Sequence, residues 1–296
     1  MLGQFQAPTE QPADLLRKIK FLNHAYSGPA PEGTLAIERD GHYLLRGVFS
    51  PEEIAQLRDE ILAVFRDVPA DKRDGRFSGE NAEMFRYQMF NRSALCQQAM
   101  ARPAVLAVLE PLLGDDCHVI ASTAWHNPPG SASAPRGQEW HVDAGPHVPR
   151  AEGIEWPEEI PYPIFVVGSH IYLQDCNLED GPTAVIPGSH TSGRVPPSEQ
   201  VWDLDLPYKG RSREVHVAKA GDVGFFVSDS WHRRLPPADN AAGRFFLQTN
   251  YGRRDISQRV LPTIEVNHVK FASRLRATTE RQRRLIGLHP QVFYDG

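Results

Sequence analysis

The chain of 296 residues has a formal net charge of −5, with 41% hydrophobic and 23% charged residues, a composition ordinary for globular proteins. No apolar run reaches the roughly 18 residues of a membrane span, the first residues lack a signal-peptide layout, and the mildly acidic balance argues against nucleic-acid binding. Three widely spaced cysteines, Cys96, Cys117 and Cys176, exclude a disulfide scaffold and indicate a reducing, cytoplasmic location.

The first third of the chain is predicted to be mainly helical. Apolar residues recur there at helical spacing, Ser50-Pro51 is a typical helix start, and Gly114 is a typical helix end. The predicted elements are helices at 13–22, 51–68 and 103–113 and a short strand at 42–48.

From residue 117 onward the pattern changes to short β-rich runs separated by turn residues, which indicates an all-β barrel or sandwich core. The predicted strands are 118–123, 139–143, 165–174, 183–186, 214–217, 223–227 and 244–250. We therefore expect one domain over 1–296, with a helical part at 1–116, the β core at 117–252 and a C-terminal helical segment at 253–296.

Two segments outside the predicted strands are also of interest. The Pro-rich stretch 144–163 has no clear period, and we expect it to form a lid over the site described below.

The expected helix at 271–288 belongs to a basic run with six Lys or Arg residues and one Glu between 270 and 284. Such a run is usually a solvated helix face, and a local anion site is the alternative.

The first group that could carry chemistry is the segment His141-Val142-Asp143. On a strand, residues two apart face the same side, so this imidazole and this carboxylate would project together. They would supply two ligands of a two-histidine, one-carboxylate site, which leaves open positions at an iron for a co-substrate and O2. A His-x-Asp segment is common without a metal, so a third ligand is needed.

The third ligand is expected to be a distant histidine, and His232 is the best candidate because it follows the apolar strand 223–227. Arg244 lies beyond the next loop, on the expected neighbouring antiparallel strand. Its guanidinium can donate two parallel hydrogen bonds to a carboxylate, although an arginine at the surface is the simpler interpretation. Arg233 and Arg234 are expected to point to opposite faces of their strand.

Three motifs occur in order within residues 118–252: His141-Val142-Asp143, the segment EDGPTAVIPGSH at 179–190, and the segment 221–244. In this combination the chain resembles the phytanoyl-CoA dioxygenase-like family of Fe(II)/2-oxoglutarate-dependent oxygenases. The resemblance implies a mainly β fold with flanking α-helices, built on a double-stranded β-helix core of the jelly-roll or cupin-like type.

The resemblance also implies roles for individual residues. The implied iron ligands are His141, Asp143 and His232. Arg244 would hold the distal carboxylate of 2-oxoglutarate. Asn127 and Gln174 are further candidates for contact with this co-substrate, although Asn127 precedes two prolines and could instead be a turn residue.

The implied activity is an Fe(II)- and 2-oxoglutarate-dependent dioxygenase that uses O2 to hydroxylate a small organic molecule, releasing succinate and CO2. Desaturation, epimerisation or cyclisation with the same cofactors are alternatives. Halogenating relatives carry Gly or Ala at the position of Asp143, so halogenation is not expected.

Two other functional classes stay open: a non-catalytic β-barrel that binds small molecules, and a hydrolytic zinc site, which would not need Arg244. The sequence identifies neither the substrate nor the oligomeric state.

Overall fold

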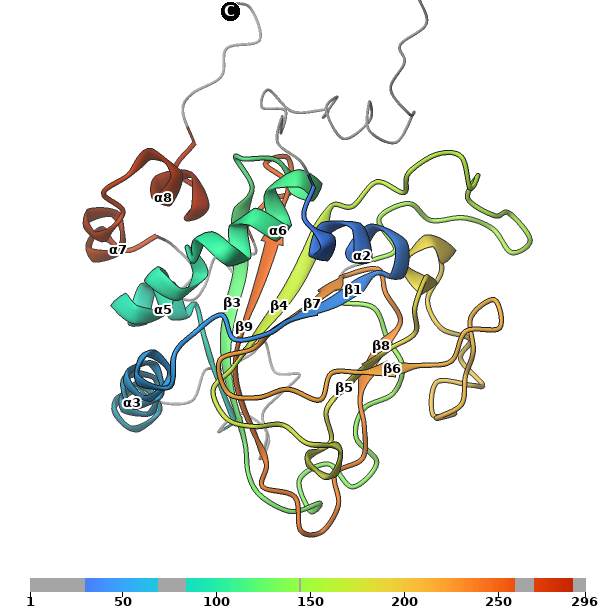
Figure 1. The fold of residues 1–296 in the computed structure, drawn as a ribbon, viewed down its shortest axis with the longest axis horizontal. Coiled ribbons are helices and arrows are strands. Elements are labelled where there is room, and N and C mark those ends of the chain that lie inside the picture. Colours follow the sequence, from blue (N-terminus) through green and yellow to red (C-terminus); the bar gives the residue numbers. More distant parts are fainter. Residues whose placement is uncertain (1–29, 69–83, 144, 259–268, 290–296) are drawn as a thin grey trace, which may run out of the picture.

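The structure, a computed structural model, describes residues 30–68, 84–143, 145–258 and 269–289; the predicted helix at 13–22 lies outside these ranges. Two antiparallel sheets form the centre of the molecule, with strand orders β1-β7-β4-β9-β3-β2 and β6-β5-β8 (Figure 1). Strand bounds are His42–Leu45 (β1), Phe85–Tyr87 (β2), His118–Asn127 (β3), Val166–Tyr172 (β4), Thr183–Val185 (β5), Glu214–Val215 (β6), Val223–Val227 (β7), His232–Arg234 (β8) and Arg244–Gly252 (β9). Neighbouring strands come from distant parts of the sequence, which agrees with the predicted mainly β fold.

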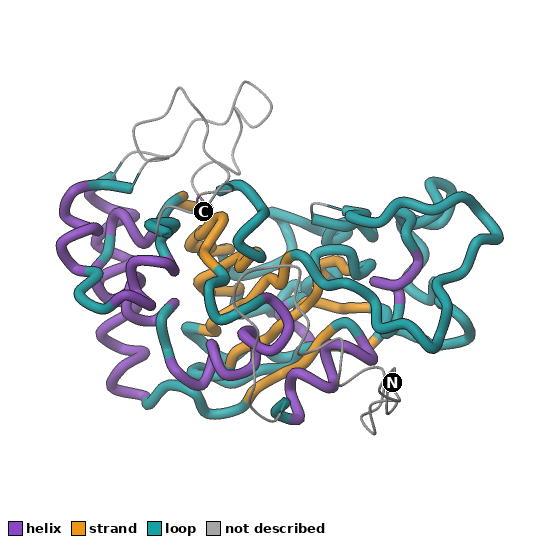
Figure 2. Tube along the Cα trace, turned by 90° about the horizontal axis from the view of Figure 1, so that it is seen from above, coloured by secondary structure: helices purple, strands orange, loops and turns teal. Residues whose placement is uncertain are grey.

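Helices flank the larger sheet, and seen from above they gather on one side of the strands (Figure 2). Helix bounds are Glu32–Asp40 (α2), Pro51–Asp67 (α3), Met89–Arg92 (α4), Ala94–Met100 (α5), Pro103–Leu113 (α6), Phe271–Arg276 (α7) and Glu280–Leu285 (α8). Helix α3 begins with a capping box, in which the Ser50 hydroxyl accepts a hydrogen bond from the Glu53 amide and the Glu53 carboxylate accepts one from the Ser50 amide. The predicted helices at 51–68 and 103–113 are confirmed.

The two faces of the larger sheet have different neighbours, because successive side chains of its strands point to opposite sides. In β7, Phe225 belongs to the hydrophobic cluster that also contains Leu57 of α3 and Leu109 of α6, whereas Phe226 faces a cavity on the other side. In β9, Leu247 likewise joins that cluster. Because successive side chains of a strand point to opposite faces, one face of this sheet binds the helices and the other is free to build a site.

The predicted strand at 139–143 is wrong. The segment pairs with β8 through an isolated antiparallel bridge, formed by reciprocal 3.0 Å hydrogen bonds between the backbones of His141 and His232. The Asp143 amide donates instead to the Ser228 carbonyl, in the turn that precedes β8. Since β8 is only three residues long, it offers too little edge for a regular ladder.

The predicted C-terminal helix at 271–288 is two short helices, α7 and α8. Chain direction changes between them, where the Thr279 hydroxyl accepts a hydrogen bond from the Gln282 amide and starts α8. Part of the basic run is not solvated: Arg276 donates to the Gln97 side chain of α5 at 2.7 Å, and Arg281 forms a 2.8 Å ion pair with Glu110 of α6. These arginines therefore fix the two helices to the rest of the fold.

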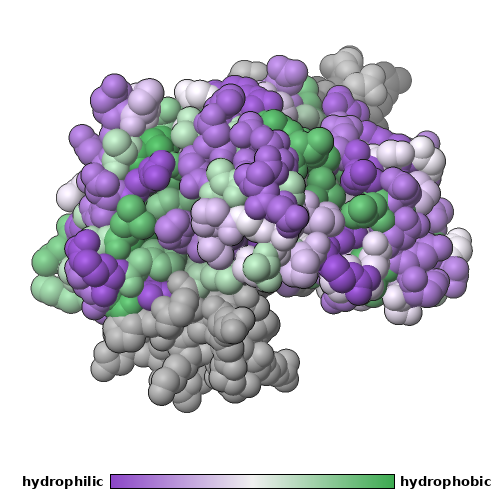
Figure 3. Space-filling view, turned by 90° about the horizontal axis from the view of Figure 1, so that it is seen from below, coloured by the Kyte–Doolittle hydropathy of each residue, from purple (hydrophilic) through white to green (hydrophobic). Residues whose placement is uncertain are grey.

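Hydrophobic and hydrophilic residues are interspersed on the face seen from below (Figure 3). Such scattered apolar residues are normal on protein surfaces. Within the described ranges, no helix has both the length and the apolar character that crossing a membrane would require.

Candidate metal centre

His141 and His232 lie opposite each other across the bridge between β8 and the segment that precedes the 145–163 loop, with their rings tilted by 53°. Their ring centroids are 4.4 Å apart. Nδ1 of His141 lies 2.8 Å from the Glu139 carbonyl oxygen, and Nδ1 of His232 lies 2.9 Å from the Ser230 carbonyl oxygen. A carbonyl can only accept, so both Nδ1 atoms carry a proton, and Nε2 of each neutral imidazole has the lone pair that a metal ion would use.

Asp143 adds a carboxylate to the two imidazoles. Its Oδ1 atom lies 3.6 Å from His232 Nε2, and one potential ligand atom from each of His141, Asp143 and His232 lies within 4.8 Å of the other two. Among the described residues, this is the one set of three His, Cys, Asp or Glu side chains that converges in this way. The structure thus brings together the three residues predicted as ligands.

The electrostatics of the group favour a cation. Burial and, after it, the neighbouring His232 lower the pKa of His141 to about 4, so His141 is neutral near pH 7. Burial also opposes protonation of His232, but the Asp143 carboxylate outweighs it and raises the pKa of this imidazole above its ordinary value. A metal ion would take the place of the proton that Asp143 and His232 attract, and the donor set suits non-haem Fe(II) with positions left open.

The three residues line a cavity of about 310 Å3 between the two sheets. The larger sheet contributes His170 of β4, Phe226 of β7 and Phe246 of β9, and the smaller sheet contributes Thr183 of β5 and Arg234 of β8. No described residue of the loop 145–163 is among the lining residues. The loop instead docks elsewhere through Asp229, whose carboxylate contacts the backbone and ring of His147 and the hydroxyl of Tyr162, which does not support the expected lid.

Arg244 and Asn127 also line the cavity, where they face each other from β9 and β3. Nε and Nη2 of Arg244 donate to the single oxygen Oδ1 of Asn127, at 3.3 and 3.2 Å. The guanidinium lies 5.1 Å from the centre of the Phe246 ring and is buried. This buried cation contacts a neutral amide oxygen and an aromatic ring, so an anionic ligand would stabilise it.

Gln174 lies outside the cavity lining. Its side-chain amide donates to the Gly243 carbonyl at 2.8 Å, which fixes the turn directly before Arg244. In this structure Gln174 therefore positions the start of β9, and its amide does not face the proposed co-substrate.

Two cavity residues were missed by sequence reasoning. His170, which was not among the predicted site residues, lies on β4 between Phe226 and Phe246, and burial together with the charge of Arg244 lowers its pKa to about 3. Arg234 lies two residues after His232 on β8 and also lines the cavity. Strand alternation from His232 was the available signal for Arg234, because residues two apart share a face.

The chain is similar to known proteins both in sequence and in fold. Residues 37–234 match the family described as Phytanoyl-CoA dioxygenase (PhyH). Ectoine dioxygenase from Bordetella bronchiseptica is 27% identical over 218 residues, which cover 66% of this chain and 66% of that protein, just under two thirds of each.

Solved structures with the same fold include EctD from S. alaskensis, with a TM-score of 0.59 and 23% identity over 78% of this chain and 80% of that one. HygX from Streptomyces hygroscopicus, solved with nickel and 2-oxoglutarate bound, has a TM-score of 0.56 and 15% identity over 79% of this chain and 91% of that one. Together with the family match, these likenesses confirm the resemblance and the fold class predicted from the sequence.

Proposed function

Because the chain belongs to the phytanoyl-CoA dioxygenase family, we propose that it is an Fe(II)- and 2-oxoglutarate-dependent dioxygenase. The proposed reaction is the hydroxylation of a small organic molecule, with consumption of O2 and release of succinate and CO2. The observation that carries the proposal is the convergence of His141, Asp143 and His232 in a cavity that also contains the buried guanidinium of Arg244.

In this proposal, Nε2 of His141, Nε2 of His232 and the carboxylate of Asp143 hold the metal. Bound Fe(II) would supply the activation of O2 toward a C–H bond of the substrate. The Nδ1 contacts to the carbonyls of Glu139 and Ser230 keep both imidazoles in the tautomer that can bind a cation. Asp143 occupies the position that halogenating relatives leave vacant, so the proposal favours hydroxylation over halogen transfer.

The remaining cavity residues position the co-substrate and exclude water. Arg244 is proposed to bind the distal carboxylate of 2-oxoglutarate, and Asn127 keeps its guanidinium in place. The rings of Phe226 and Phe246 form an apolar wall beside the metal ligands, which limits access of bulk water to the reacting groups.

The relatives support a small-molecule substrate. Ectoine dioxygenase is named for a small molecule, and HygX has also been solved with hygromycin B bound. Two further structures of this fold are described as an epimerase and a carbocyclase from nogalamycin biosynthesis, SnoN and SnoK. Epimerisation or cyclisation with the same cofactors is therefore the second candidate for this cavity.

We also propose that 1–116, 117–252 and 253–296 act as one oxygenase domain in the cytoplasm. The single-domain assignment is supported by one hydrophobic cluster that contains Leu109 of α6, Leu247 of β9 and Leu285 of α8. The location is supported by the three cysteines, which are all buried and free.

The test is anaerobic titration of the Fe(II)-loaded protein with 2-oxoglutarate, followed by exposure to O2. We expect a charge-transfer absorption band on titration, and slow conversion of 2-oxoglutarate to succinate when O2 is added. Asp143→Ala should lose both signals because it removes a metal ligand. A wild-type protein that neither shows the band nor consumes 2-oxoglutarate would contradict the proposed function.

A further inference from the structure

A second buried arginine, Arg234, lines the same cavity as Arg244. It lies on the face of β8 that carries His232, directly opposite Thr183 of β5, and Thr183 also lines the cavity. Only 4% of Arg234 is exposed. A side chain that is so long and so polar is rarely buried without a partner.

The guanidinium of Arg234 lacks such a partner in the described part of the chain. Its Nε and Nη2 atoms are inaccessible to solvent and have no hydrogen-bond acceptor. A guanidinium stays protonated at neutral pH, so this buried group carries a positive charge. Two buried donors of a cation without an acceptor are costly, and an anionic ligand would remove that cost.

The two arginines differ in whether the Nε–Nη2 edge of the guanidinium already has a hydrogen-bond acceptor. In Arg244, Nε and Nη2 are both directed at Asn127 Oδ1. In Arg234, the same Nε–Nη2 edge is unused. This edge presents two parallel N–H groups, the fork that matches a carboxylate.

The charged residues that line the cavity also favour an anionic ligand. Among the described lining residues, Asp143 is the one carboxylate, and three are arginines: Arg233, Arg234 and Arg244. Arg233 is partly satisfied, because it donates to the Arg136 carbonyl and lies over the Trp140 ring. Arg234 therefore has the greatest need of a negative ligand.

We propose that Arg234 and Arg244 together form a two-guanidinium site for the distal carboxylate of 2-oxoglutarate. Arg234 provides the bidentate Nε–Nη2 edge, and Arg244, held by Asn127, provides the second contact. This inference rests on the proposed function, and it changes the expectation from the sequence, which gave the carboxylate to Arg244 alone.

The test compares two ligands that differ only in the distal carboxylate: 2-oxoglutarate and 2-oxovalerate, which ends in a methyl group. Their affinities for Mn(II)-loaded protein are measured by anaerobic calorimetry, with no turnover. Arg234→Gln should weaken 2-oxoglutarate by about tenfold or more and change 2-oxovalerate by less than about twofold, because only the first ligand can pair with the fork. Arg234→Lys should recover only part of the loss, since it keeps the charge and loses the fork.

Arg211→Gln is the matched control, because Arg211 is a half-exposed arginine paired with Asp40 outside the cavity, and it should bind both ligands as the wild type does. Retained Mn(II) affinity and an unchanged circular dichroism spectrum in Arg234→Gln show that this variant is folded. The inference is overturned if Arg234→Gln binds 2-oxoglutarate with wild-type affinity, or if it weakens both ligands equally. Failure of the wild type to bind 2-oxoglutarate at all would instead overturn the proposed function.

Discussion

Three pairs of histidines lie close together in the described part of this fold: His141 with His232, His42 with His216, and His118 with His289. Of these pairs, only the first belongs to a candidate metal site. In the first pair, His141 and His232 direct Nδ1 at backbone carbonyls and leave Nε2 free beside the carboxylate of Asp143. In the second pair, Nδ1 of His42 and Nε2 of His216 face each other at 3.1 Å. Each of these two pairs consists of two histidines with a carboxylate nearby, but the ring nitrogens of the two pairs contact different groups.

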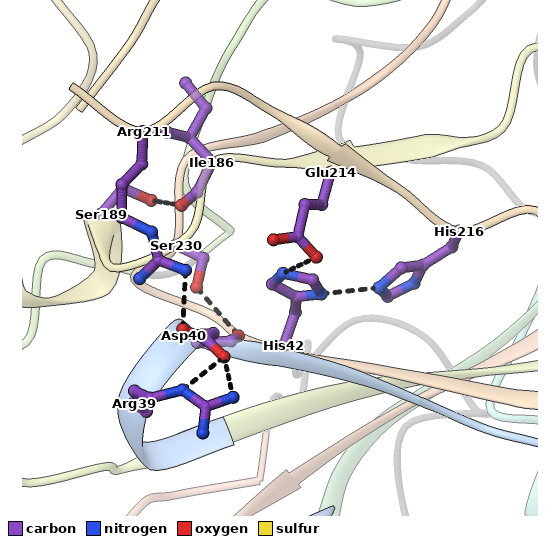
Figure 4. A network of polar contacts seen from close by, with 10 residues as sticks. Arg39, Asp40, His42, Ile186, Ser189, Arg211, Glu214, His216 and Ser230 are labelled. Carbon is purple, nitrogen blue, oxygen red and sulfur yellow. Dashed lines mark hydrogen bonds and ion pairs between the residues drawn. The ribbon is translucent and has the colours of Figure 1, made fainter. Parts of the chain in front are cut away.

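The second pair joins the two sheets at their edges. His42 belongs to β1 of the larger sheet, and His216 directly follows β6 of the smaller one. Figure 4 shows His42 lying between His216 and Glu214, whose carboxylate is 3.5 Å from the other ring nitrogen of His42. The potential ligand atoms therefore form a line and do not converge on one point.

The difference between the pairs teaches that a histidine pair with a nearby acid is not enough for a metal site. Backbone carbonyls that bind Nδ1 fix the tautomer and aim the second nitrogen at a common point. A histidine that binds another histidine uses that nitrogen for the fold instead. The comparison can be tested by changing corresponding groups in the two pairs.

The largest effect is expected on metal binding. His141→Ala, Asp143→Ala and His232→Ala should each weaken Mn(II) or Fe(II) binding by more than about 100-fold, since losing a direct ligand should exceed the cost of losing an orienting contact. Anaerobic isothermal titration measures this. His42→Ala should bind metal as the wild type does, and unchanged affinity in His232→Ala would place the third ligand elsewhere.

An intermediate effect is expected on the pH dependence of stability. Burial lowers the pKa of His42 and, more strongly, that of His216 below the ordinary value of 6.5. Below pH 6.5 the unfolded chain takes up protons that the folded protein does not, so the free energy of unfolding falls as the pH falls toward the folded-state pKa values. Each histidine contributes at most about 1.4 kcal/mol per pH unit in that window.

Several charged groups face this pair. Glu214 and Asp40 favour protonation of His42 and Arg211 opposes it, while Arg46 opposes protonation of His216. Urea unfolding of the metal-free protein at pH 7.5 and 5.5 measures the loss. The double variant His42→Gln/His216→Gln should lose less stability on acidification than the wild type. Equal losses in the two proteins would show that this pair does not resist protonation.

The smallest effect is expected at the acid of the second pair. Glu214 is 60% exposed, so Glu214→Gln should change the free energy of unfolding by less than about 1 kcal/mol and leave metal affinity unchanged. The corresponding change in the first pair, Asp143→Asn, should strongly weaken metal binding. Similar metal affinities in the two variants would remove the distinction between the pairs.

The sequence by itself determined the parts that depend on local patterns. The helix over Pro103–Leu113 and the strand over Val223–Val227 form at the predicted residues, because their apolar spacing and end signals act within a few residues. The motif order around His141, Asp143 and His232 also sufficed to indicate the family and the ligand types. The sequence can predict this helix, this strand and these motifs because each of them lies within one short segment of the chain.

Only the tertiary structure decided which side chains share the cavity. His170 was not among the predicted site residues and lines the cavity, whereas Gln174 was predicted to contact the co-substrate and instead fixes a turn. The loop 145–163 contacts Asp229, which is not a lining residue. Arg234 was expected only to face away from Arg233 on its strand, and it lines the same cavity as Arg244 with two buried donors that lack an acceptor. Each outcome depends on strand pairing between residues far apart in the sequence, and such pairing sets the facing side chains without leaving a local pattern.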